Sequence, residues 1–163
     1  GLSGINNFPT HSIVDGSFRN ILEETGMGFS KEVEMVQLAT KMDLFSCVYV
    51  ATPEEAIQMA KVGADTIIAH VGTTVGGSIG VIGATVDMDF AIKRTQEIIN
   101  AGRTVNKDII FLAHGGPVNT PEDVKIILKN TDAHGFVGAS SLERMAVETS
   151  LTELTQKFKA LTL

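Results

Sequence analysis

Two histidines end apolar segments of the chain in similar contexts. His70 closes the run TIIAH and is followed after one residue by a glycine, and His114 closes IFLAH and is followed by Gly115 and Gly116. Imidazole titrates near neutral pH, so it can move a proton or bind a metal ion. A histidine at a strand end can equally be held by a backbone carbonyl. We predict that His70 and His114 share one pocket as an acid–base pair, with structural hydrogen bonding as the alternative.

Small residues follow the last two apolar segments. Glycine pairs let backbone amides approach an anion, and the serines of GASS (138–141) add hydroxyls where the last helix is expected to begin. Barrels often bind phosphate with the loops after their final two strands. The alternative is turn glycines followed by an ordinary serine cap. The predicted site for a small anionic metabolite comprises Gly115, Gly116, Gly138, Ala139, Ser140 and Ser141.

A third group of polar side chains follows the first apolar segment. Asn7 lies at its end, and residues 9–29 form a connection long enough to be an active-site lid. In this segment Arg19 can clamp a carboxylate or phosphate, and Asp15 or Glu24 can act as a base. Two histidines with Glu23, Glu24 or Asp15 could also hold a divalent cation such as Mg²⁺, although no HxH or CxxC spacing marks a metal site. Taken singly, each charge is typical of a solvated loop.

These residues need a scaffold, and apolar runs without alternation predict parallel strands that are buried on both faces. Glycines and polar residues separate the runs, and stretches with helical spacing fill the gaps between them. The predicted strands are residues 3–8, 44–50, 65–71, 108–114 and 134–139.

Local signals mark the intervening helices. TPEE (52–55) and TPED (120–123) each combine a threonine cap, a proline at the first helical position and an acidic residue three after the cap. A further helix is expected over 90–101, ended by Gly102. Ser30 is predicted to cap another helix, whose apolar side chains are Met35, Leu38, Ala39 and Met42. The last helix follows Ser141, with an apolar stripe of Val147, Leu151, Leu154, Phe158 and Leu161.

Five βα units leave two architectures open, the doubly wound sheet and the (β/α)8 barrel. The G-x-G-x-x-G of a dinucleotide-binding fold does not follow the first strand, and GGSIG (76–80) is too short and lies in a loop. A complete barrel needs roughly 250 residues, and this chain has 163. The sheet is therefore either open, or the chain is part of a longer one.

Composition excludes several classes of protein. The formal charge of −6 and the pI of about 5.1 disfavour nucleic-acid binding. No run approaches the roughly 18 apolar residues of a membrane span, and no signal-peptide pattern opens the sequence. The single cysteine, Cys47, excludes an intrachain disulfide and is expected to be a buried, inert thiol. A cytoplasmic location is the default.

Several longer motifs carry a family resemblance. The combination of NNFPT, DGSFRNILEETGMGFSKEVEM, AHVGTTVGGSIG, FLAHGGP and HGFVGASSLER resembles the phosphoenolpyruvate hydrolase-like TIM-barrel family, over residues 2 to about 160. That family has been described as TIM-barrel signal-transduction proteins, and it forms the C-terminal barrel of plant tobamovirus-resistance proteins. The matching positions beyond those given above are Glu23, Gly26, Gly76 and Gly77.

The resemblance implies that this chain holds strands four to eight of one TIM barrel and that the first three βα units are absent from residues 1–163. It also implies a phosphoenolpyruvate-like ligand and a homo-oligomer. The leading hypothesis is a hydrolase or lyase for a small phosphorylated or carboxylate metabolite. The alternative is a ligand-sensing or protein-interaction barrel without turnover, which would act through a protein partner.

Overall fold

The computed structural model of the protein describes residues 1–78, 80 and 86–161. Strands and helices alternate along the chain, as expected from the sequence. The strands are β1 (Gly4–Ile5), β2 (Phe45–Val50), β3 (Thr66–His70), β4 (Ile110–His114) and β5 (Gly135–Phe136). The helices are η1 (His11–Ile13), α1 (Gly16–Glu24), α2 (Phe29–Lys41), α3 (Pro53–Lys61), α4 (Met88–Arg103), α5 (Pro121–Asn130), α6 (Ser140–Glu143) and α7 (Met145–Lys159).

The five strands form one parallel sheet in the order β1-β2-β3-β4-β5. A doubly wound sheet reverses its strand order at a switch point, and this sheet does not. Sequential parallel strands that each lead into a covering helix are the arrangement of a (β/α) barrel. The α/β fold class is therefore confirmed, and the sheet corresponds to part of a TIM barrel.

The two faces of the sheet differ in how well they are covered. On one face Val48, Ile67 and Phe111 are fully buried against side chains from α2, α3 and α4. On the other face Phe45 and Ile110 are 50% and 46% exposed, at the ends of the strands away from the histidines. Alternation along each strand sets this division, because successive side chains point to opposite faces. The second face corresponds to a barrel interior.

Both threonine–proline signals start helices as predicted. Thr52 and Thr120 each accept a hydrogen bond from the backbone of the acidic residue three positions on, and that residue's side chain returns to the cap. These two capping boxes fix the starts of α3 and α5, the helices that follow β2 and β4.

Two other helix boundaries differ from the prediction. The second helix, α2, begins at Phe29, with Gly28 in the cap position, so Ser30 is not its cap. Instead, the Ser30 N–H donates to Glu23 Oε1 at 3.2 Å. The predicted stop at Gly102 is also wrong, because α4 continues through it to Arg103. Gly102 is buried, and a Cβ there would lie 2.7 Å from the Phe111 ring, so the glycine serves helix–sheet packing.

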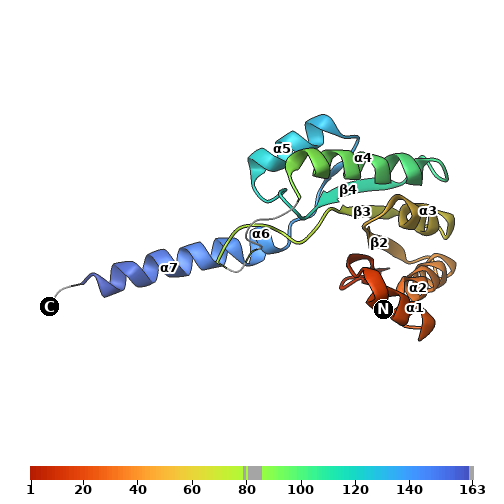
Figure 1. Ribbon diagram of the computed structural model, residues 1–163, viewed down its shortest axis with the longest axis horizontal. Helices are drawn as coiled ribbons and strands as arrows, with labels where there is room; N and C mark the ends of the chain where they lie inside the picture. Colours follow the sequence, from red (N-terminus) through yellow and green to blue (C-terminus); the bar gives the residue numbers. More distant parts are fainter. Residues whose placement is uncertain (79, 81–85, 162–163) are drawn as a thin grey trace.

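The apolar stripes predicted for α2 and for the last helix also differ from expectation. In α2 the buried apolar side chains include Val36 and Ala39, whereas Leu38 and Met42 are exposed. The last helical segment forms but is divided at Arg144 into α6 and α7, and α7 extends away from the body of the protein (Figure 1). Its stripe is exposed at Val147, Leu151, Leu154 and Phe158.

The first turn of α7 is fastened to the glycine-rich segment after β3. Arg144 donates to the carbonyl oxygen of Gly76 at 3.1 Å and to Glu148 at 3.0 Å, and Glu148 accepts the Ser78 N–H at 2.8 Å. The loop that leaves β3 therefore crosses to the elements that follow β5. This segment is described through residue 78 and again at residue 80, and the rest of the predicted GGSIG loop, Ile79, lies outside the described residues.

Candidate functional site

The two strand-end histidines lie side by side, as their matching positions predict. His70 and His114 are direct partners in the β3–β4 register. Their ring centroids are 5.0 Å apart, and only 6% and 5% of the two residues is exposed. Both project from the face that corresponds to the barrel interior, because Ile68 and Leu112, two residues earlier on each strand, share that face.

Backbone contacts hold the two imidazoles in opposite tautomers. Nδ1 of His114 lies 2.7 Å from the carbonyl oxygen of Val137, which can only accept, so this Nδ1 carries the hydrogen. Nδ1 of His70 accepts the N–H of Gly72 at 3.2 Å, so the hydrogen of a neutral His70 is on Nε2. Neither Nε2 has a hydrogen-bond partner among the described residues. One free nitrogen is therefore a donor and the other an acceptor.

Burial keeps this pair uncharged. The pKa of His70 is lowered to about 4, mainly by burial and secondly by the neighbouring His114. Burial also lowers the pKa of His114, although its hydrogen bond to Val137 acts in the opposite direction. At neutral pH both rings are neutral imidazoles, and the donor and acceptor assignments above apply.

Tyr49 completes an aromatic cluster with the two histidines, and the sequence analysis missed it. The centroid of its ring lies 5.1 Å from His114 and 6.0 Å from His70, in edge-to-face arrangements. Burial is the main reason that the pKa of Tyr49 is raised, so its hydroxyl stays protonated. The available signal was alternation in FSCVYV, which puts Tyr49 and Cys47 on one face. Cys47 is half-buried, and burial raises its pKa, which disfavours the thiolate as expected of an inert thiol.

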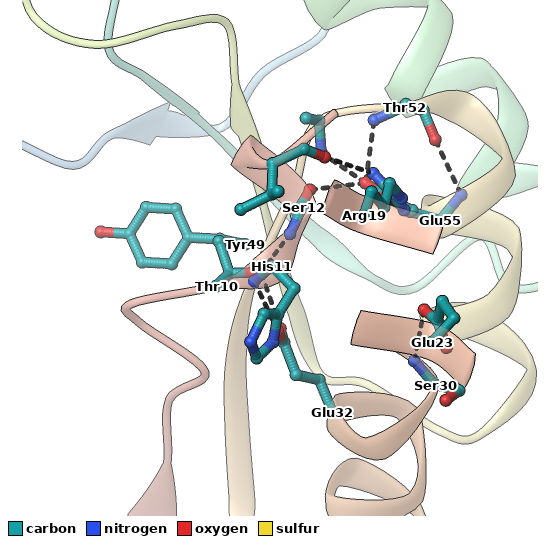
Figure 2. Close-up of polar contacts among 12 residues, drawn as sticks. Thr10, His11, Ser12, Arg19, Glu23, Ser30, Glu32, Tyr49, Thr52 and Glu55 are labelled. Carbon is teal, nitrogen blue, oxygen red and sulfur yellow. Dashed lines mark hydrogen bonds and ion pairs between the residues drawn. The ribbon is translucent and has the colours of Figure 1, made fainter. Parts of the chain in front are cut away.

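Arg19, predicted to bind substrate, is held by a buried glutamate instead (Figure 2). Its guanidinium forms an ion pair with Glu55, which is 2% exposed. Glu55 also accepts hydrogen bonds from Ser12 Oγ at 2.5 Å and from the Ala51 N–H at 2.8 Å. This carboxylate therefore fastens the segment before α1 to the start of α3, and the arginine is a part of the scaffold.

The side chain of Asn7, also predicted to bind the ligand, is hydrogen-bonded within the protein. Its side-chain oxygen accepts the Tyr49 N–H at 2.7 Å and its amide donates to the Tyr49 carbonyl at 3.0 Å, so it replaces a strand residue beside β2. The amide also donates to Glu32 Oε2 at 2.5 Å. Glu32 receives further bonds from Thr10 and from both the backbone and the ring of His11 (Figure 2). The Asn7 amide is thus already used within the protein.

The predicted anion-binding residues lie in the loops that follow the neighbouring strands β4 and β5. Gly115 and Gly116 have φ of 84° and 55°, a backbone conformation that favours glycine. The Gly116 N–H donates to the Gly72 carbonyl at 2.8 Å and the Gly115 carbonyl accepts the Val118 N–H, so the pair joins the loops after β3 and β4. Gly138, Ala139, Ser140 and Ser141 are half-buried around the start of the four-residue helix α6.

Asp15 and Glu24, the carboxylates predicted as bases, are exposed at opposite ends of α1. Asp15 precedes the helix without a side-chain capping bond and lines a cavity beside His70. Among the described residues no group of three or more histidine, cysteine or acidic side chains is arranged to hold a metal ion. The expected assembly of a Mg²⁺ site from the histidines and these carboxylates does not fit this arrangement.

The strand order and the interior-facing cluster define an α/β barrel-type domain with a candidate site at the carboxyl ends of its strands. The chain matches the phosphoenolpyruvate hydrolase-like family over residues 1–161, and it belongs to that family. No helix in the described part of the chain is long and apolar enough to cross a membrane.

Relatives in two kingdoms share the segment. The chain is 45% identical to the ToMV susceptible protein tm-1(GCR26) and 44% identical to the ToMV resistance protein Tm-1(GCR237), both of Solanum lycopersicum. Each match covers the whole chain but 22% of the tomato protein. A putative transcriptional regulatory protein, y4pA of Sinorhizobium fredii (strain NBRC 101917 / NGR234), is 32% identical over 98% of the chain and 26% of its own length.

Solved structures are more distant. An N-acetylmannosamine-6-phosphate 2-epimerase from Clostridium perfringens matches with a TM-score of 0.46 and 22% identity, over 78% of this chain and 47% of its own. A nitroalkane oxidase from Streptomyces ansochromogenes matches with a TM-score of 0.43 and 24% identity, over 68% of this chain and 31% of its own.

Proposed function

We propose that this domain belongs to an enzyme that carries out hydrolase or lyase chemistry on a small phosphorylated or carboxylate metabolite. The observation that carries the proposal is the pair of neutral imidazoles with opposite free nitrogens. His114 Nε2, with its lone pair, removes a proton from water or from the substrate. His70 Nε2–H donates a hydrogen bond to the oxygen on which negative charge develops.

Neutral imidazole suits the second role because its Nε2–H can donate a hydrogen bond to the developing negative charge while the ring itself stays uncharged. The ring of Tyr49 packs against the same imidazoles, and its hydroxyl, kept protonated by burial, is a candidate second donor. The glycine and serine loops after β4 and β5 remain candidates for contacts to the rest of the ligand. The catalytic roles of Asp15 and Glu24 receive no comparable support from their exposed positions.

We also propose that three preceding βα units complete the barrel. The exposed Phe45 and Ile110 support this, because they lie on the interior face and would be covered by further strands. The two edge strands, β1 and β5, contain two residues each, and no further strand pairs with their outer edges in the described part of the chain.

The test is release of pyruvate from phosphoenolpyruvate, measured with this chain and with a chain that includes the preceding units. Replacement of His114 by alanine is expected to lower the turnover rate about 100-fold or more, because general base catalysis is lost. His134 provides the matched control, since it precedes β5 and its ring accepts the Phe111 N–H, its one side-chain hydrogen bond among the described residues. Equal turnover in His114→Ala and in His134→Gln would refute the base, and turnover restricted to the longer chain supports the completed barrel.

Self-association is a further proposal, and the exposed stripe of α7 supports it. A second copy of the chain is the partner that the charges favour. Glu153 lies exposed near the middle of α7 and Lys157 and Lys159 lie in the last turn, so an antiparallel pair of α7 helices can bring opposite charges together. The same surface would serve an interaction barrel without turnover, which predicts that phosphoenolpyruvate binds and no pyruvate is released.

A further inference from the structure

A cavity of about 370 Å³ opens beside His70 at the carboxyl ends of β2 and β3. It lies between the segment that precedes α1 and the first half of α4, and this volume falls in the range of small-molecule sites. Two arginines, Arg19 and Arg94, contribute to its walls together with the apolar side chains of Val71 and Phe90. A cavity lined by cations and apolar groups suits a small organic anion.

The two arginines differ in how many of their hydrogen-bond donors are already bonded within the protein. Arg19 is committed to the buried Glu55 carboxylate and to the carbonyl of Val14. Within the described part of the chain Arg94 forms one ion pair, a 3.5 Å contact from its Nε to Glu97 on the same helix. Its two terminal amino groups have no hydrogen-bond partner among these residues. The guanidinium also lies over the Phe90 ring, 5.5 Å from the centroid, which limits its orientations.

We infer that Arg94 binds the anionic group of the ligand, a carboxylate or a phosphate, and that the cavity holds the rest of the molecule against His70. The inference rests on the proposed function, and it assigns recognition of the substrate's anionic group to Arg94. A planar guanidinium with two free amino groups matches two oxygens of either oxyanion. The Gly116 N–H is already bonded to Gly72, so this side chain is a better anion contact than that amide.

The class of ligand follows from the two groups at the ends of the cavity, Arg94 and His70. It is a small acid with one oxyanion for Arg94 and a carbonyl or ester oxygen for His70 Nε2–H.

Titration calorimetry with phosphoenolpyruvate, pyruvate and inorganic phosphate, at constant ionic strength, tests this assignment. Arg94→Gln is expected to weaken binding of phosphoenolpyruvate at least about tenfold, the loss of a charge-assisted hydrogen bond, and Arg94→Lys is expected to recover part of it. Arg103→Gln is the matched control, since Arg103 is in the last turn of the same helix and pairs with Asp132. It should bind as the unmodified protein does.

Equal affinity in Arg94→Gln and the unmodified protein overturns the inference. If His114→Ala still abolishes turnover in that case, the proposed function stands and the anion is bound elsewhere. If none of the three compounds binds either this chain or the chain that includes the preceding units, both the inference and the proposed function are wrong. A comparison of phosphoenolpyruvate with pyruvate and with phosphate shows which oxyanion Arg94 recognises, because the arginine variant loses affinity only for that group.

Discussion

The buried glutamates near the ends of β1 and β2 are saturated with hydrogen bonds, whereas the histidines that end β3 and β4 each keep a ring nitrogen without a partner among the described residues. Glu55 accepts hydrogen bonds from a serine, an arginine and two backbone amides, and Glu32 is equally saturated. His70 and His114 each use one ring nitrogen and present the other. The difference separates scaffold from site, because a ring nitrogen without a protein partner can bond to water or to a ligand, whereas the saturated carboxylates have no bond left to offer.

The largest effect is expected from removing a saturated carboxylate. Glu55→Ala removes the carboxylate partner of Arg19 and the acceptor of two backbone amides, and the free energy of unfolding should fall by about 3–5 kcal/mol. Urea denaturation measures it. Glu54, exposed in the first turn of the same helix, is the control, and Glu54→Ala should cost less than about 1 kcal/mol. Similar losses in both variants would show that Glu55 is not the fastening point of the segment before α1.

The histidine pair is expected to respond to pH instead. The folded-state pKa of His70, about 4, lies below its ordinary value of 6.5, so between these values the unfolded chain binds a proton that the folded chain does not. Stability therefore decreases as pH falls through this window, by up to about 1.4 kcal/mol per pH unit for one histidine. His114, whose pKa is also lowered, acts in the same direction.

Urea denaturation at pH 7, 6 and 5 measures this slope, above the range in which most carboxylates titrate. His70→Asn should flatten it, since asparagine cannot take up the proton. A slope that is unchanged in the variant would mean that His70 is protonated as easily in the folded chain as in the unfolded one, and the neutral donor role would fail.

The same contrast explains what the sequence could predict. The strands and the two capping boxes depend on neighbouring residues, so TPEE and TPED were sufficient to place α3 and α5. The histidine pair was predictable because equivalent strand ends in a parallel sheet lie side by side. Glu55 was recognised only as part of a cap, since its contacts with Ser12 and Arg19 come from residues about 40 positions away.

The contacts of residues near the ends of β1 and β2, including Glu32, which the sequence analysis did not single out, were beyond prediction for a related reason. Arg19, Asn7 and Glu32 have the composition of a binding loop or a solvated helix, and only the tertiary structure shows that they bond to one another and to β2. The position of α7 was also beyond local reasoning. Its stripe has the spacing of a buried helix, and whether such a stripe meets the sheet or extends from it depends on the turn at Arg144 and on partners outside the segment.

The smallest effect on stability is expected at α7, where apolar rather than polar atoms lack partners. Leu154 is 53% exposed, so Leu154→Glu should change the free energy of unfolding by less than about 0.5 kcal/mol. If α7 pairs with a second copy, the same substitution puts a charge between the two stripes, and the mass from light scattering should fall from dimer to monomer. Thr152→Glu adds the same charge beside the stripe and should leave the dimer intact. A monomeric unmodified protein would refute self-association, and a dimer that survives Leu154→Glu would assign it to another surface. Either result would leave the α7 stripe for a different protein.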